Sequence, residues 1–301
     1  MEITNGRVPD TQYQELLKKI LAEGKVHHPI HGQKSLRVIG HMMRFKRENG
    51  LPATTTRDLM KYKLIHGAIG ENIAFMNGAR TLDDLEHYGC PRSFWKDWVT
   101  KEKCDMFNLR EGDLGDGSYG AAWAAFPNEN GTKFNQIETM VRLMKERPFL
   151  RTILVNPWIP YYTVSGDARN PRKVVVAPCH GWVQVHIDTI EKSFIMTHDQ
   201  RSADCPVGLQ FNMVQYFCMA LMLERVTGYR FTELVYTIKD AHIYESQFEH
   251  AQKLIDCEPR IYPTVHITDD APTENIFHFR PHHFVIEEYN PHPWFKIPTP
   301  I

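Results

Sequence analysis

The sequence predicts an α+β fold, organised as a single domain over residues 1–301 with a large mixed or mainly antiparallel sheet flanked by helices. Segments with helical periodicity alternate with segments rich in β-branched residues. The 301 residues are 42% hydrophobic, enough for a substantial core. The chain contains no repeat, low-complexity tract or long polar linker that would mark a domain boundary.

The N-terminal half opens with a well-marked helix. Residues 11–24, TQYQELLKKILAEG, carry an apolar stripe at helical spacing. Asp10 or Thr11 can cap this helix, and Gly24 ends it. The segment 112–120, GDLGDGSYG, has too many Gly and Asp residues for a regular element, so we expect a loop of the kind that often carries function. The other elements expected in this half are a strand at 35–46, a helix at 57–77 ending near Gly78, and a short helix at 81–88.

The C-terminal half contains most of the predicted sheet. The helix expected at 211–228 is apolar almost all round through Leu223, which indicates a central, buried position. The remaining elements expected here are a helix at 134–148, strands at 150–158, 173–188, 192–201 and 233–244, and a Pro-rich tail at 288–301.

Composition excludes several classes of protein. A net charge of −1 gives no bulk attraction to nucleic acid or to an anionic membrane, and we expect neither partner. The N-terminus lacks the basic and apolar regions of a secretory signal, and no stretch has about 18 consecutive apolar residues. Six scattered cysteines without a C-x-x-C pair indicate free thiols in a reducing compartment, so we expect a cytoplasmic protein, or one in the host cytoplasm if its origin is a phage.

Sixteen histidines raise the question of a metal site. The densest clusters, HHPIH (27–31) and HFRPHH (278–283), adjoin prolines and lack the H-x-x-x-H spacing of a helical zinc site. Surface loops explain both clusters, and we expect no metal.

Cys179 follows a proline in the strand-like run VVVAPCHGWVQVHID (174–188). A cysteine in such a run is commonly a small core hydrophobe, and the alternative is a thiolate nucleophile. The run alone favours the core residue, so neighbouring segments must decide.

Three other groups of polar residues have both a structural and a functional interpretation. Asn212 and Gln215 are the only strongly polar side chains in helix 211–223; they either tie helix to sheet or read the edge of a base. Arg201 and Ser202, before a predicted helix N-terminus, form either a cap with a surface arginine or an anion site. In the DAHIY segment (240–244), His242 and Tyr244 share one strand face, as an aromatic pair or as ligands of a sugar hydroxyl.

Together these segments resemble the thymidylate synthase family, which includes the phage pyrimidine hydroxymethylases. The motifs occur in the family's order: GHMMRFKRENGLPATTTR (40–57), ENIAFMNG (71–78), FWKDW (94–98), GDLGDGSYG (112–120), APCHGWVQVHI (177–187), QRSADCPVGLQFN (200–212), DAHIY (240–244) and the ending NPHPWFKIPTPI (290–301). The resemblance implies a thymidylate synthase-like catalytic domain over 1–301 and makes Cys179 the nucleophile.

The chemistry that the resemblance implies is one-carbon transfer from 5,10-methylenetetrahydrofolate to C5 of dUMP, giving dTMP and dihydrofolate. C5 becomes nucleophilic when a thiolate adds to C6, and cysteine both attacks and leaves well. Glu71 would act through water as general acid and base, and Tyr119 and His180 would handle the C5 proton. Asn212 would read N3 and O4 of the base.

The resemblance also assigns the binding residues. The substrate-binding residues are Gln200, Arg201, Ser202, His242, Tyr244, Lys34 and Arg151. The folate-binding residues are Trp95, Trp98, Asp204, Gly208, Phe211 and the C-terminal Ile301. Arg151 would reach the partner's phosphate in a homodimer.

The sequence departs from the family pattern at three places. Gln210 takes a proline position, Thr152 replaces the second arginine of the family pair, and the arginine of the N-terminal phosphate loop is absent, with Lys34 as a possible substitute. These departures leave two points undecided by the sequence: which residues hold the phosphate, and which nucleotide is the substrate. Because an amide can flip to pair with cytosine, Asn212 favours uracil without proving it. The alternative activity is a dUMP or dCMP 5-hydroxymethylase, in which water adds to the same intermediate.

Overall fold

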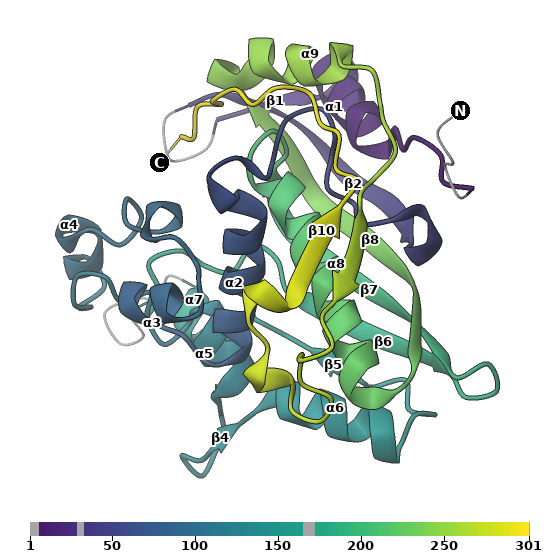
Figure 1. Ribbon diagram of the computed structural model, residues 1–301. Coiled ribbons are helices and arrows are strands. Elements are labelled where there is room, and N and C mark those ends of the chain that lie inside the picture. The colour runs from purple at the N-terminus through teal and green to yellow at the C-terminus, as the bar shows by residue number, and fades with distance from the viewer. Residues whose placement is uncertain (1–5, 29–32, 165–171, 301) are drawn as a thin grey trace.

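A six-stranded sheet forms the centre of the protein in the computed structural model, which describes residues 6–28, 33–164 and 172–300 (Figure 1). Its strand order is β1-β2-β8-β7-β6-β5. The pair β7 and β8 is parallel and every other pair is antiparallel, so the sheet is mixed, as predicted. The strands are β1 (Lys25–His27), β2 (Ser35–Lys46), β5 (Leu154–Val155), β6 (Trp182–Asp188), β7 (Ser193–Asp204) and β8 (Arg230–Tyr244).

Helix α8 (Gly208–Thr227) is the central helix, as its apolar sequence predicts. It connects the parallel strands β7 and β8 and packs between these strands and α2 (Leu64–Met76). One face of the sheet is therefore covered by helices (Figure 1). The other helices are α1 (Gln12–Glu23), α3 (Leu82–His87), α4 (Lys101–Asp105), α5 (Tyr119–Ala124), α6 (Gln136–Glu146), α7 (Pro160–Thr163) and α9 (Phe248–Asp256).

The C-terminal region folds back over the helices. Two hairpins lie outside the main sheet: β3 (Phe126–Pro127) with β4 (Lys133–Phe134), and β9 (Thr264–Ile267) with β10 (Phe284–Glu287). After β10, the Tyr289 hydroxyl lies 2.8 Å from Thr54 O and accepts the N–H of Leu59 at 3.1 Å. These bonds fasten the tail to the segment that precedes α2.

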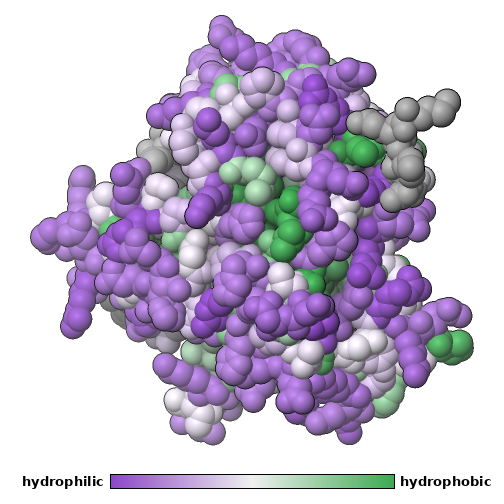
Figure 2. All heavy atoms as spheres, viewed as in Figure 1, coloured by the Kyte–Doolittle hydropathy of each residue, from purple (hydrophilic) through white to green (hydrophobic). Residues whose placement is uncertain are grey.

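No helix among the described residues covers the opposite face of the sheet (Figure 1). Ile39 and Met42 of β2 are 70% and 55% exposed, and Thr197 of β7 and Gln184 of β6 are half-buried. On the side shown in Figure 2, hydrophilic residues cover most of the surface, and hydrophobic residues gather near the centre, over the region of β10. No helix in the described part of the chain is long and apolar enough to span a membrane.

Three predicted elements are shorter than expected. The helix expected at 57–77 begins only at Leu64, because Tyr62 and Lys63 have positive φ angles. Of the strand expected at 150–158, only Leu154–Val155 pairs. Of the strand expected at 173–188, residues 173–181 form an irregular segment. The carbonyls of Val174 and Val175 accept hydrogen bonds from the Arg172 guanidinium, at 2.8 and 2.6 Å, instead of from a neighbouring strand.

Candidate active site

Cys179 lies at the end of this irregular segment, just before β6, and is half-buried. Its N–H donates to the Tyr119 hydroxyl oxygen at 2.7 Å, and its carbonyl accepts the N–H of Arg201 at 2.7 Å. The Arg201 guanidinium lies 3.3 Å from Sγ and also bonds the carbonyls of Ala177 and Pro178. The sulfur is thus held next to a fixed positive charge.

Two opposing effects act on the Cys179 thiol. Burial raises its pKa, while the charge of Arg201 and the hydrogen bond with Tyr119 lower it. Of these effects burial is the largest, so the resting group is a thiol, and the adjacent guanidinium stabilises the thiolate when it forms. All six cysteines are free, as predicted.

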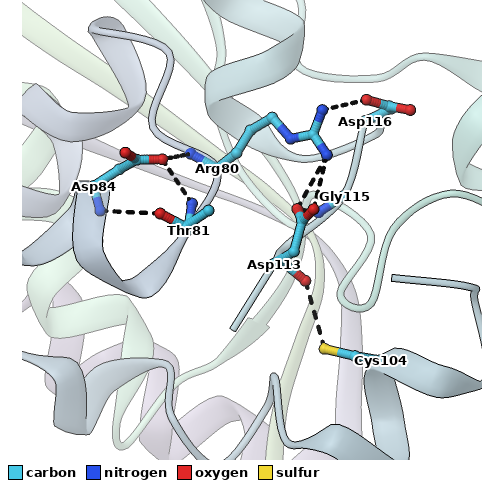
Figure 3. Close-up of polar contacts among 7 residues, drawn as sticks. All are labelled: Arg80, Thr81, Asp84, Cys104, Asp113, Gly115 and Asp116. Atoms are coloured by element: carbon cyan, nitrogen blue, oxygen red, sulfur yellow. Dashed lines mark hydrogen bonds and ion pairs between the residues drawn. The ribbon is translucent and has the colours of Figure 1, made fainter. Parts of the chain in front are cut away.

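The Gly- and Asp-rich segment before Tyr119 is held by an arginine (Figure 3). The Arg80 guanidinium pairs with both carboxylate oxygens of Asp113, at 3.1 and 3.0 Å, and with Asp116. Asp113 also accepts the N–H of Gly115 at 2.8 Å. These bonds fix the loop from which α5 begins at Tyr119, so the two aspartates have a structural role.

His180 and Tyr119 stack in the interior of the site. Their ring centroids lie 4.5 Å apart, and His180 Nδ1 is 2.5 Å from the Tyr216 hydroxyl. Burial lowers the pKa of His180 to about 3, so its ring is neutral at physiological pH. Burial raises the pKa of Tyr119 well above its usual range, and the phenol keeps its proton.

Glu71, on α2, is a buried carboxylate with two side-chain donors. Trp95 Nε1 donates to Oε1, and Gln215 Nε2, from α8, donates to Oε2. Burial raises the pKa of Glu71, and the two hydrogen bonds partly oppose that effect. Burial therefore favours the protonated form of Glu71, which suits a group that gives and takes up protons during a reaction.

Asn212 continues the same hydrogen-bonded path. Its Nδ2 donates to Gln215 Oε1 at 2.8 Å, and its Oδ1 accepts from Gln200 Nε2 at 3.0 Å. Gln200 also accepts from the Tyr236 hydroxyl. The path joins α2, α8, β7 and β8 across the interior.

The ends of β7 and β8 bring further predicted residues together. The rings of His242 and Tyr244 make an edge contact at 5.0 Å on one strand face, as predicted. Burial raises the pKa of Tyr244 to about 12, and the nearby groups Asp204 and Cys179 contribute. Ser202 follows Arg201, and its N–H lies 3.4 Å from Cys179 O.

Two predicted phosphate ligands lie away from the sulfur in this chain. Lys34 is exposed, and its carbonyl accepts the N–H of Glu245 at 2.9 Å, beside the end of β8. Arg151 is exposed, and its carbonyl accepts from Gln184, which belongs to the open face of the sheet. The structure brings neither side chain to Cys179.

Two of the predicted folate residues, Asp204 and Trp98, lie beside the C-terminal tail. Gln247 Nε2 bridges Asp204 Oδ2 and Pro298 O, both at 2.9 Å. Burial raises the pKa of Asp204 to about 6, and its buried Oδ1 has no hydrogen-bond partner among the described residues. An open cleft of about 550 Å³ lies nearby and is lined by Ser93, Phe94, Asp97, Trp98, His250, Lys296, Pro298 and Thr299.

Two more of the predicted folate residues, Gly208 and Phe211, lie at the N-terminus of helix α8. Phe211 contacts Phe94 of the cleft, with ring centroids 6.1 Å apart. Gly208 begins the helix, and a side chain there would approach Asn212 Oδ1 to 3.8 Å. Ile301 lies outside the described residues.

The structure adds several residues that support the site. Gln215 stands out in the sequence as a polar residue in an apolar helix, and the structure places it on Glu71. Arg80 and Gln247 carry no sequence signal, because their partners are distant in the chain. Arg57 is 4% exposed and lies 3.4 Å from Phe295 O in the tail.

One histidine cluster outside the site resembles a metal-binding group. Ligand atoms of Asp270, His282 and His283 lie within 4.8 Å of one another. His283 Nδ1, however, accepts the N–H of Arg280 at 3.0 Å, which places the ring proton on Nε2 and leaves His283 no free lone pair.

The order of motifs and the site geometry agree with a comparison against known protein families, in which residues 11–301 match the thymidylate synthase family. The match covers essentially the whole chain and includes every described residue of the site. The chain therefore belongs to the thymidylate synthase family, whose members are methyl- or hydroxymethyltransferases that transfer a one-carbon unit from methylenetetrahydrofolate to a pyrimidine.

Proposed function

We propose that this protein is a thymidylate synthase, which converts dUMP to dTMP and releases dihydrofolate. The observation that carries the proposal is the position of Cys179 Sγ, 3.3 Å from the Arg201 guanidinium and fixed through Tyr119. In this proposal the enzyme acts in the cytoplasm as one catalytic domain over 1–301.

The sulfur of Cys179 attacks C6 of the pyrimidine. The C5–C6 electron pair moves toward the O4 carbonyl, and C5 becomes an enol carbon able to attack an electrophile. Arg201 favours this step, because its charge stabilises the thiolate in a partly buried site. The sulfur leaves C6 again when the proton at C5 has been lost.

Three further residues manage protons around the ring. Glu71 acts through water on O4 and on the folate nitrogen, and its raised pKa favours the protonated form that a general acid needs. Tyr119 accepts the Cys179 N–H and so keeps its own O–H free to donate. His180, neutral and stacked on Tyr119, orders the polar network that receives the C5 proton.

The nucleotide is recognised by groups at the strand ends. Asn212 pairs with N3–H and O4 of uracil, and His242 and Tyr244 bond the 3′-hydroxyl. Arg201 and Ser202 bind the 5′-phosphate. Gln200 supports Asn212, and Lys34 is the candidate for an additional phosphate contact.

The residues around the tail fit 5,10-methylenetetrahydrofolate. Asp204 has a buried oxygen that no described residue bonds, which suits a donor on a heterocycle, and Trp98 and Phe94 line a cleft for an aromatic ring. Trp95, Gly208, Phe211 and Ile301 complete the proposed folate site. Bound there, methylenetetrahydrofolate supplies the one-carbon unit and the hydride.

We further propose a homodimer formed through the open face of the sheet. Arg151 lies beside Gln184 on that face and away from its own Cys179, so it is placed to reach a partner's phosphate across a twofold interface. Arg151→Ala should weaken nucleotide binding by about 1.5–3 kcal/mol for each charge-assisted bond lost.

Mixed dimers test the shared site. Each of the variants Arg151→Ala and Cys179→Ser has low activity alone, and a mixture that exchanges subunits should regain activity, because one of its two sites combines an intact Cys179 with an intact Arg151. A monomer at micromolar concentration in ultracentrifugation, or no recovery of activity despite subunit exchange, would refute the proposal of a shared site.

The product decides between methyl and hydroxymethyl transfer. Trp95, Trp98 and a tail fastened by Gln247 favour exclusion of water, and therefore methyl transfer. Mass spectrometry of the nucleotide formed from dUMP, or from dCMP, with methylenetetrahydrofolate identifies the reaction. We expect dTMP from dUMP; a 5-hydroxymethyl nucleotide would establish the alternative activity, and no product from either would refute both.

A further inference from the structure

Asn212 is held between two glutamines whose amide orientations are each set by a backbone carbonyl. Gln215 Nε2 donates to Ala68 O at 3.0 Å, and Gln200 Nε2 donates to Ser202 O at 3.0 Å. Gln215 and Gln200 are 1% and 2% exposed, so water does not compete for these bonds. A backbone carbonyl can only accept, so neither amide can reverse without facing oxygen with oxygen.

These two orientations determine that of Asn212. The second N–H of Gln215 Nε2 is used by Glu71, so Gln215 presents only its oxygen to Asn212, which must turn Nδ2 toward it. On the other side, Gln200 presents Nε2, which requires Asn212 to turn Oδ1 toward it. The polarity of the Asn212 amide is therefore fixed from both ends.

The fixed amide retains one N–H and one oxygen lone pair for a ligand. Uracil offers an acceptor at O4 and a donor at N3–H, which match this pair. Cytosine offers a donor at N4 and an acceptor at N3, which would require the reversed amide. Reversal would place Oδ1 against Gln215 Oε1 and Nδ2 against Gln200 Nε2, and two buried mismatches are costly.

We propose that Gln215 is a positioning residue for base choice, which anchors Asn212 through Ala68 O in the orientation that selects uracil over cytosine. The inference rests on the proposed function, since it takes the base to lie at Asn212. An isolated asparagine could turn its amide to pair with either base. The selectivity for uracil therefore comes from the two glutamines that orient Asn212 and not from the asparagine alone.

The test is equilibrium binding of dUMP and dCMP, measured by calorimetry on the full-length protein. The unmodified protein should bind dUMP more tightly. Gln215→Met keeps the length of the side chain and removes its polarity, and it should narrow the ratio of the two affinities by about tenfold. Gln200→Met removes the donor on the other side of Asn212 and should also narrow the ratio of dUMP to dCMP affinity. The test therefore does not depend on one variant folding.

Asn72→Leu is the matched control. Asn72 Nδ2 donates to the backbone oxygen of Gln215 at 2.9 Å, so the variant loosens the same residue without changing the amide polarity. A general loss of packing weakens the binding of both nucleotides and leaves the ratio of their affinities unchanged. An unchanged ratio in both glutamine variants, or equal narrowing in Asn72→Leu, overturns the inference while the proposed function stands. Failure of the unmodified protein to bind either nucleotide refutes the proposed function itself.

Discussion

Trp95→Phe should move the pH dependence of catalysis, because Trp95 is one of the two side chains in the described part of the protein that donate to the Glu71 carboxylate. Phenylalanine keeps an aromatic ring against Phe75 and Tyr119, whose centroids lie 6.1 and 6.2 Å from that of Trp95. The change removes the indole N–H, and the ionised form of Glu71 loses a donor that the protonated form needs less. The pKa of Glu71, already raised by burial, therefore rises further.

A hydrogen bond to a charged group contributes about 1.5–3 kcal/mol, which corresponds to a movement of about one to two pH units. The assay is kcat/KM for dUMP across the pH range, in which the limb controlled by Glu71 should move to higher pH by that amount. Trp123→Phe is the matched control, since Trp123 is fully buried against Phe75 and its Nε1 has no partner among the described residues. An unmoved limb in Trp95→Phe, or an equal movement in Trp123→Phe, would refute this account of Glu71.

Three other substitutions have defined outcomes. Asn212→Asp should lower turnover of dUMP and raise the relative use of dCMP, because a protonated carboxyl can donate to N3 of cytosine. If the ratio of kcat/KM for dUMP to that for dCMP is the same in the variant and the unmodified enzyme, Asn212 does not recognise the base. Asp204→Asn should stabilise the protein at pH 8 by up to about 3 kcal/mol, because the folded pKa is about 6 against an ordinary 3.8, so the carboxylate charge costs stability above pH 6. Thermal melts of the variant and the unmodified protein at pH 8 and below pH 4 check this, since the extra stability of Asp204→Asn should be present at pH 8 and absent in acid. Arg80→Gln should reduce unfolding free energy in urea by about 1 kcal/mol and lower kcat, because Arg80 holds the loop before Tyr119; no change in either would contradict that role.

The long elements were predictable because burial and periodicity agree in them. The strand at 35–46 matches β2 at both ends, and the apolar helix expected at 211–228 is the central α8. The β-branched run 174–176 misled the prediction, because it lies in an irregular segment whose carbonyls bond the Arg172 guanidinium and not in a paired strand. Helix α9 and the hairpin of β9 and β10 were not predicted, since both are short and depend on long-range packing.

The site was predictable where the family resemblance assigns its residues. The resemblance places Cys179, Arg201 and Tyr119 in one site, and in the structure Cys179 contacts the other two. The partners of Glu71 were not predictable as a set, because Trp95 and Gln215 lie 24 and 144 residues from it in the chain. Contacts of this kind depend on the tertiary fold, which local sequence does not encode.

The most direct test of the central claim follows the hydrogen at C5 of dUMP. With methylenetetrahydrofolate and dUMP labelled with tritium at C5, the unmodified enzyme should release tritium in step with the formation of dTMP. Cys179→Ser should release none while calorimetry still detects dUMP binding, since the side chain changes little in size. Product formation by Cys179→Ser at a rate near that of the unmodified enzyme would contradict the account, because C5 would then react without an adduct at C6.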